Sequence, residues 1–364
     1  MNKYLTKHYL QIKNGGIKVL IKKLISLLVI FPIYLISIPI FFIIIIIKPW
    51  FLIRIKELHS SRIGHFSAET ELYCCEIDEK INLPAKNYKD FFYLKKYVCN
   101  QFLADMWKRK LTILPYWILR PVNNLINLFY KITGLENEHT ITSPLYLDRD
   151  VYNLFDKFGP HINFTDDEEL KGKSILKKFG LPDNAKFVCL TVRDSGYLNR
   201  YLKKDDTKKW DYHSYRDGDI EKYILAAEEL ASRGYYIFRM GINVIKPMRS
   251  SNPKIIDYSN SNMRSDFMDV YIGAKCSFCL TTGVGIDAIP AIFRRPIACI
   301  HVPLGLSIYT SSDKYLLLTK HHINKLNNKE LTMSEIFSSN VALSTNSNDF
   351  LNNNVELIEN TPDE

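Results

Sequence analysis

A glycine-rich turn in the C-terminal half of the chain carries the strongest chemical signal. The mostly apolar run 276–280 is followed by Thr-Thr-Gly-Val-Gly, residues 281–285, and then by a helical pattern. Threonine hydroxyls and the free N–H groups of a helix start suit an anion such as phosphate. The alternative is an ordinary strand–helix turn, since the pattern matches neither common phosphate-binding motif. The candidate phosphate ligands are Thr281, Thr282, Gly283 and Gly285.

Asp287, just beyond this turn, has two equally good interpretations. It could accept a hydrogen bond from a ribose hydroxyl, or it could stabilise the start of its own helix.

Two arginines follow predicted strands. Arg193 comes after the apolar run 187–192, and Arg239 comes after 235–238. The carboxyl ends of parallel strands lie on one edge of a sheet, and a guanidinium group there can bind phosphate in a bidentate manner. Each arginine alone would be read as a surface ion-pair residue. Together with the glycine turn, they favour an anionic ligand.

Further candidates lie between other elements. His65 stands between a predicted strand at 51–56 and a helix at 66–75, where it could act as a general base or simply begin the helix. The polar, aromatic segment 212–216 could hold a sugar or an acceptor, or be an ordinary loop. Asp266 and Asp269 favour a helix N-terminus over catalysis. The other predicted cleft residues are Arg62, Gly64, Tyr212, His213, Arg216 and Arg264.

The cysteines do not predict a metal site. Cys276 and Cys279 form a Cys-x-x-Cys pair, but no second pair follows at metal-binding spacing, so burial on a strand explains them better. No Asp-x-Asp motif occurs either. An odd total of 7 cysteines fits a reducing compartment.

The elements around these residues alternate between strand and helix. Strands are predicted at 187–192, 235–240, 254–257, 276–280 and 296–300, with helices at 219–232, 266–274 and 286–293. Such alternation predicts a parallel, doubly wound α/β sheet.

The N-terminal part differs from the rest. Residues 24–47 carry no charge and would form a helix of about 36 Å, enough to cross a membrane. Basic residues flank both ends, and Pro32 and Pro39 interrupt the run. A simple span and a re-entrant hairpin are therefore both possible, each with a cytoplasmic globular part. The segment 107–132 is predicted either as an interfacial segment on anionic lipid or as a core helix with a basic end.

Composition limits the remaining possibilities. The chain has 364 residues, 46% hydrophobic residues and a net charge of +9. This length suits two domains, and the hydrophobic fraction excludes a disordered chain. The lysines are spread out and no nucleic-acid-binding motif occurs, so nucleic acid is not an expected partner.

The sequence predicts five regions. They are a basic flank at 1–23, a membrane segment at 24–47, a first α/β domain at 50–165, a second α/β domain at 166–337 and a polar tail at 338–364. Thr361 to Glu364 form a capping-box pattern, which predicts a helix start and a chain shorter than its relatives. A chance match of polar residues is the alternative.

Several motifs in this order resemble a bacterial glycosyltransferase family encoded in surface-polysaccharide gene clusters. They are Arg62-Ile-Gly-His65, Val192-Arg-Asp194, Tyr212-His-Ser-Tyr-Arg216, Arg239-Met-Gly241, Arg264-Ser-Asp266 and Thr281-Thr-Gly-Val-Gly285. The resemblance covers roughly residues 60 to 360. It implies a GT-B-like fold with two Rossmann-like domains, an acceptor-side domain at 50–165 and a nucleotide-sugar-binding domain at 166–337. The nucleotide-sugar would lie in the cleft between them. The membrane segment and the short first domain depart from a soluble enzyme of this type.

The combined prediction is a membrane-attached glycosyltransferase at the inner membrane, with its catalytic part in the cytoplasm. It would use a nucleotide-sugar donor, a glycan or lipid-linked acceptor and neither metal nor cofactor. Arg193, Arg239 and the 281–285 turn would hold the diphosphate, and His65 would be the base. The alternatives are a nucleotide-sugar epimerase and a non-catalytic scaffold of polysaccharide assembly.

Overall fold

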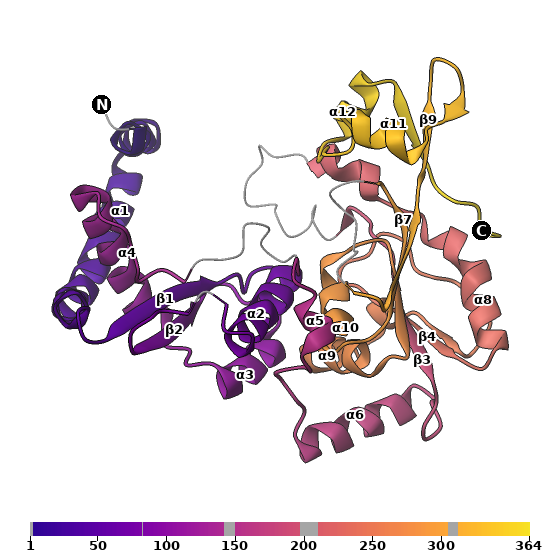
Figure 1. Ribbon diagram of the computed structural model, residues 1–364, viewed down its shortest axis with the longest axis horizontal. Coiled ribbons are helices and arrows are strands. Elements are labelled where there is room, and N and C mark those ends of the chain that lie inside the picture. Colours follow the sequence, from indigo (N-terminus) through magenta and orange to yellow (C-terminus); the bar gives the residue numbers. More distant parts are fainter. Residues whose placement is uncertain (1–2, 82, 142–149, 197–209, 305–311) are drawn as a thin grey trace. The chain divides into compact units, whose positions relative to one another are not determined.

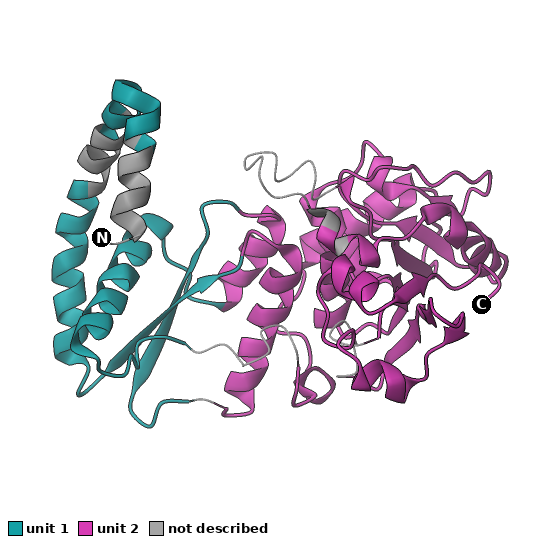
Figure 2. Cartoon of the chain, turned by 90° about the horizontal axis from the view of Figure 1, so that it is seen from above, with its two compact units in different colours: residues 1–59, 82–97, 111–142 teal, residues 60–81, 98–110, 143–364 magenta. Residues whose placement is uncertain are grey.

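The computed structural model describes residues 3–81, 83–141, 150–196, 210–304 and 312–364 (Figure 1). The chain divides into two compact units (Figure 2). Unit 1 comprises residues 1–59, 82–97 and 111–142, and unit 2 comprises residues 60–81, 98–110 and 143–364. Each unit is therefore assembled from three separate stretches of the chain.

Unit 1 combines a two-stranded parallel sheet with two long helices. Strands β1 (Leu52–Leu58) and β2 (Tyr88–Leu94) pair in parallel. Helices α1 (Lys3–Ile47) and α4 (Tyr116–Thr133) supply most of the remaining core. This unit has fewer strands among its described residues than the predicted Rossmann-like domain would have.

The prediction of a membrane segment at 24–47 is wrong. No helix of the described residues is long and apolar enough to cross a membrane. The run forms the C-terminal part of α1, which continues through Pro32 and Pro39. Phe41 and Ile44 are buried in a core that α4 shares. Part of the apolar run therefore packs against protein, and neither the span nor the re-entrant hairpin is retained.

The segment 107–132 follows its core-helix alternative. It spans the end of α3 (Gln101–Lys110) and most of α4. Val122 and Ile126 of α4 are fully buried beside Phe41 and Tyr93. Lys108, at the end of α3, remains solvent-exposed, as the predicted basic end requires.

Unit 2 contains the predicted parallel sheet. Its six strands run in the order β5-β4-β3-β6-β7-β8, and every neighbouring pair is parallel. The strands are β3 (Phe187–Thr191), β4 (Tyr236–Arg239), β5 (Ile255–Ile256), β6 (Phe278–Thr281), β7 (Ile297–Val302) and β8 (Tyr315–Thr319). The connecting helices are α8 (Ile224–Ser232), α9 (Asp266–Lys275) and α10 (Ala288–Ile292), and α6 (Asp166–Lys178) precedes the sheet.

Alternate side chains of the central strands enter two different cores. Phe187 and Cys189 of β3 pack with residues of α9, and Leu190 packs with residues of α8. In β4, Phe238 joins the α9 side and Ile237 joins the α8 side. This alternation follows from the strand period of two residues. Both faces of the sheet are covered, which explains the almost continuous apolar sequence of β3.

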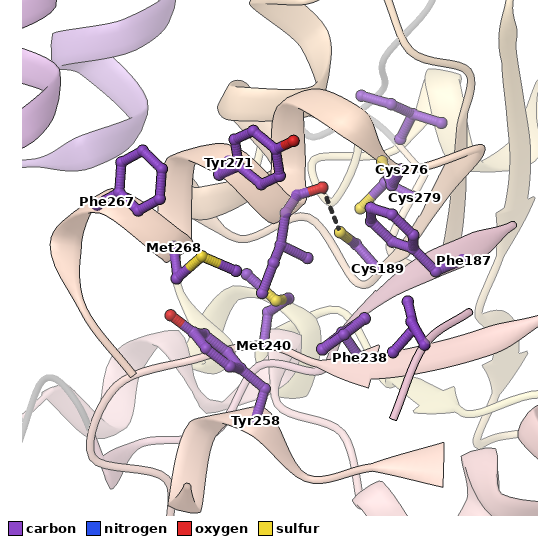
Figure 3. Packing of buried hydrophobic residues seen from close by; sticks show 13 residues of the cluster. Phe187, Cys189, Phe238, Met240, Tyr258, Phe267, Met268, Tyr271, Cys276 and Cys279 are labelled. Carbon is purple, nitrogen blue, oxygen red and sulfur yellow. Dashed lines mark hydrogen bonds between the residues drawn. The ribbon is translucent and has the colours of Figure 1, made fainter. Parts of the chain in front are cut away.

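The α9-side core contains the cysteines that the sequence placed on a buried strand. Figure 3 shows Cys189, Cys276 and Cys279 among aromatic side chains such as Phe187. All three are buried and unbridged, and the Cys189 thiol lies 3.6 Å from the carbonyl oxygen of Ile272. Burial raises the pKa of Cys189 and of Cys279, so these thiols remain protonated and inert.

Two helices from the N-terminal third of the chain also belong to unit 2. Helix α2 (Ile63–Asp78) contacts α10, and α3 contacts α9. The side chain of Asn100, just before α3, donates a hydrogen bond to the Asp266 carbonyl oxygen at 2.9 Å. The start of α2 lies at the carboxyl edge of the parallel sheet, because Gly64 lies against Gly285, just beyond the end of β6.

The segment 338–364, predicted as a polar tail, contains regular structure. Helix α12 (Ser347–Asn352) is followed by β11 (Val355–Ile358), which pairs antiparallel with β9 (His321–Asn324). At the end, Thr361 and Glu364 form the reciprocal hydrogen bonds of a capping box. The remaining small elements are α5 (Leu154–Lys157), η1 (Trp210–Arg216), η2 (Ile220–Tyr223), η3 (Tyr258–Asn260), η4 (Gly285–Asp287), β10 (Lys329–Glu330) and α11 (Met333–Ser338).

Candidate functional site

The candidate site lies where the direction of strand order reverses. From β3 the chain proceeds to β4 and β5 on one side, whereas β6, β7 and β8 follow on the other side. Such a reversal opens a crevice beyond the carboxyl ends of the two central strands, where ligands of open α/β sheets bind. Here these ends are Thr191 of β3 and Thr281 of β6, which are directly paired.

A hydrogen-bond network fixes the 281–285 turn. The hydroxyl of Thr281 accepts from the Thr191 hydroxyl at 2.7 Å and donates to Asp287 Oδ2 at 3.0 Å. Asp287 Oδ2 also accepts the backbone N–H of Val284 at 2.9 Å. The Asp287 carboxylate is buried, so its place in the structure matches the helix-start interpretation. Gly283 has a φ of 74°, a conformation that favours glycine.

The turn lies directly against the first turn of α2. A Cβ atom on Gly64 would stand 3.0 Å from the Cα and 3.2 Å from the carbonyl oxygen of Gly285. Only two glycines allow the backbones to approach this closely. Both residues border a pocket of about 380 Å³.

This pocket, called the switch-point pocket below, collects residues from several separate segments of unit 2. Its wall includes the ends of β3 and β6, the segment after β4, the start of α2 and one residue of α9. It is lined by Arg62, Ile63, Gly64, His65, Cys99, Thr191, Val192, Arg193, Asp194, Arg216, Met240, Gly241, Ile242, Val244, Asp269, Gly283, Val284, Gly285 and Ile286.

Two arginines give the pocket its charge. Arg193 Nε donates to Asp217 at 3.1 Å, and Arg216 donates to the carbonyl oxygen of Gly283 in the turn. Burial, together with the positive charge of Arg216, lowers the pKa of Arg193. The two guanidinium groups thus repel each other, and an anion placed near both would relieve this repulsion. Arg62 lines the same pocket.

His65 belongs to this pocket as well. Its Nδ1 lies 2.7 Å from Oε1 of Glu69, one helical turn along α2. A carboxylate in this position orients the imidazole ring and fixes which ring nitrogen carries the proton. The glutamate is buried, whereas the histidine is partly exposed. The arrangement could therefore accept a proton from a ligand hydroxyl.

Asp269 lies in this pocket, although the sequence favoured a role at a helix N-terminus over catalysis. Tyr258 donates to its Oδ1 at 2.8 Å, and Arg264 donates to its Oδ2 at 2.9 Å. Burial raises the pKa of Asp269 to about 6, although both neighbours partly oppose this effect. A buried carboxyl with a shifted pKa in a cleft is a common feature of functional sites. Asp269 stands in the first turn of α9, so its sequence position suggested a helix-stabilising role.

Not every predicted site residue lies in this pocket. Arg264 does not line the pocket and contacts only its residue Asp269. The Thr282 hydroxyl does not line it either, and instead accepts a hydrogen bond from the backbone N–H of Arg193 at 2.8 Å. Tyr212 is exposed and does not line it. The side chain of His213 lies outside the described residues.

Arg239 lies on the other side of the sheet. It is paired with Leu190 of β3, whose side chain belongs to the α8-side core. Arg239 is 1% exposed and lies 3.5 Å from Asp257 and 3.9 Å from Asp194. It borders a second cavity and not the switch-point pocket. Because side chains alternate between the two faces of a strand, Arg239 lies on the α8 side and does not reach the pocket that Arg193 lines.

One cluster of possible metal ligands in unit 2 already has a cation. Ligand atoms of Glu71, Cys75 and His161 lie within 4.8 Å of one another. Arg294 donates to the buried Glu71 carboxylate, and His161 Nδ1 lies 2.9 Å from the same carboxylate. The guanidinium supplies the positive charge that a metal ion would bring, so the cluster is best described as a buried ion-pair network.

No protein-family model and no curated protein sequence matches this chain. Among solved structures, ADP-heptose LPS heptosyltransferase II of E. coli is similar at 13% identity and a TM-score of 0.39, over 73% of this chain and 90% of that one. A glycosyl transferase family 9 protein from Veillonella parvula is similar at 11% identity and a TM-score of 0.42, over 73% and 85%. E. coli heptosyltransferase WaaC with ADP is similar at 11% identity and a TM-score of 0.37, over 79% of this chain and 96% of that one. Similarity at this level assigns neither fold nor activity.

Proposed function

We propose that the protein is a glycosyltransferase that transfers a sugar from a nucleotide-sugar to a glycan acceptor of a surface polysaccharide, free or lipid-linked. The observation that carries this proposal is the switch-point pocket. It combines two repelling arginines, a glycine turn fixed by Asp287, and a histidine–glutamate pair. These groups suit a diphosphate and a hydroxyl that must lose its proton.

In the proposed reaction, the diphosphate lies between Arg193, Arg216 and the N–H groups of the turn. As the bond from the sugar to the phosphate breaks, negative charge grows on the leaving nucleotide. The two guanidinium groups stabilise that charge without having to move. Because they supply the positive charge, the reaction needs no metal ion and no cofactor.

His65 acts on the acceptor. Its imidazole takes the proton of the attacking hydroxyl, and Glu69 stabilises the imidazolium ion that forms. The hydroxyl oxygen then forms the new bond to the anomeric carbon, and the nucleotide leaves with the bonding electron pair.

We place the pocket in a reducing compartment, on the cytoplasmic side of the cell. All seven cysteines are free thiols, which is typical of such a compartment.

The test uses the purified full-length chain with a panel of nucleotide-sugars. Thermal stabilisation identifies the nucleotide-sugar that binds. Release of nucleoside diphosphate is then measured with and without isolated cell-surface glycan, in the presence of a chelator. Acceptor-dependent release supports the proposal. A changed sugar without release would indicate an epimerase, and binding without either reaction would indicate a scaffold.

A further inference from the structure

A second cavity, of about 430 Å³, lies in unit 2 beside the switch-point pocket. It shares Val192 and Asp194 with that pocket, but its other residues come from the α8 side of the strand ends. They are Ser195, Asp217, Gly218, Asp219, Ile220, Lys222, Arg239, Ile245, Lys246 and Glu359. The two cavities thus have one wall in common, formed just after β3.

The charges of this cavity do not suit a phosphate. Lys246 lies 3.1 Å from Asp219, and Lys222 lies 2.7 Å from Glu359. Asp194 and Asp217 add two more carboxylates. An incoming phosphate would meet these acids as well as the cations, and it would have to break existing ion pairs. An uncharged ligand avoids both costs.

Arg239 borders this cavity with a guanidinium group whose hydrogen bonds are incomplete. Its other two nitrogens donate to Ser259 and to the carbonyl oxygen of Lys246. Its Nε–H is buried and has no hydrogen-bond partner among the described residues. Buried donors are normally paired, because an unpaired one costs free energy.

The cavity also has apolar walls, from Val192, Ile220 and Ile245. Aliphatic surface beside carboxylate, ammonium and guanidinium groups matches a neutral sugar. Its hydroxyls both donate and accept hydrogen bonds, and its C–H groups pack on apolar side chains.

We propose that this second cavity binds a neutral sugar ring. The proposal rests on the proposed function, since the wall shared with the diphosphate pocket places such a ring next to the reacting centre. The ring belongs either to the donor or to the acceptor glycan.

The variant for the test is Lys246→Met. Lys246 is half exposed, so its replacement leaves the fold intact, but it removes one hydrogen-bond donor from the cavity. Lys325→Met is the matched control, because Lys325 is exposed and lines neither cavity. Titration calorimetry measures the affinity for UDP-glucose and UDP, or for the sugar–nucleotide pair that the panel selects, and kinetics give the acceptor KM.

A donor-sugar site predicts that Lys246→Met weakens the nucleotide-sugar about tenfold and leaves the nucleoside diphosphate unchanged. An acceptor site predicts that only the acceptor KM rises, by a similar factor. An equal loss of affinity for the nucleotide-sugar and for the free nucleoside diphosphate would overturn the proposal. So would a variant in which both affinities and the acceptor KM are unchanged.

A chain that binds no nucleotide at all would refute the proposed function separately. The second cavity is then tested with free glucose and galactose, by NMR line broadening of the sugar in the presence of either variant. If the sugar signal broadens with Lys325→Met but not with Lys246→Met, the cavity binds the sugar. Equal broadening, or none, overturns it.

Discussion

Gly64 and Gly285 come from segments far apart in the sequence, yet their backbones touch. A Cβ atom on Gly64 would be 3.0 Å from the Cα atom of Gly285. Gly64 lies in the first turn of α2, which carries His65, and Gly285 ends the turn at 281–285. The contact therefore sets the spacing between the proposed base and the proposed diphosphate site.

The first prediction concerns this contact. Gly64→Ala should lower the affinity for the nucleoside diphosphate about tenfold, because the new methyl group meets backbone and forces the helix and the turn apart. Calorimetric titration measures the effect. Gly159→Ala is the control, since a Cβ at Gly159 meets nothing within 4 Å. Equal affinities for the two variants would show that the turn tolerates the displacement.

The second prediction concerns Arg193. Arg193→Met should weaken binding of a nucleoside diphosphate by about 10- to 100-fold, the usual range for a charge-assisted contact, and leave the nucleoside alone unaffected. The comparison variant is Arg233→Met, because Arg233 is an exposed arginine paired with Glu229 on α8. If diphosphate and nucleoside lose affinity in parallel, Arg193 does not contact phosphate.

The third prediction concerns the base. His65→Gln should reduce kcat by roughly 100- to 10,000-fold, since proton removal takes place only in the transition state. The donor dissociation constant should stay within about twofold. Turnover and donor binding are measured on the same preparation, with His321→Gln, a surface histidine paired with Glu330, as reference. Unchanged turnover would leave His65 with a structural role only.

The fourth prediction follows from Asp269. Its pKa is raised from 3.8 to about 6 in the folded protein, so the native state holds a proton that the unfolded state has already lost. Stability must therefore fall as pH rises from about 4 to about 6, by up to about 3 kcal/mol from this group.

Urea unfolding of the natural protein and of Asp269→Asn at several pH values provides the test. The asparagine cannot ionise, so the unfolding free energy of the natural protein, taken relative to the variant, should decrease across this window. A constant difference between pH 4 and pH 7 would mean that Asp269 ionises normally.

Much of unit 2 was predictable because its signals are local. The apolar run of β3 and the Thr-Thr-Gly-Val-Gly turn each specify one strand end, and parallel pairing brings the two ends together. The site needed more than local signals. Arg193 and Arg239 were both expected to follow strands, but Arg239 is the last residue of β4, and its position there places it on the α8 side. That difference depends on where each strand ends, which the sequence defines only to within a residue or two.

Two other features depend on tertiary packing. The pKa of Asp269 is raised because the folded chain buries its carboxyl group, and no local sequence pattern shows that burial. The apolar run of α1 predicts a membrane segment because an apolar surface has the same sequence pattern whether it contacts lipid or protein. The burial of Phe41 and Ile44 in the core shared with α4 could be seen only in the structure.

The alternation of the two units along the chain has a consequence for how the protein is made. Unit 2 takes residues 60–81 and 98–110 from the N-terminal third, and the rest from beyond residue 142. No contiguous fragment contains it alone, so dissection at a single linker cannot yield a functional half. During synthesis, α2 leaves the ribosome long before the turn at 281–285. The pocket is completed only when nearly four-fifths of the chain has emerged, so ribosome-bound intermediates should bind nucleotide late and abruptly.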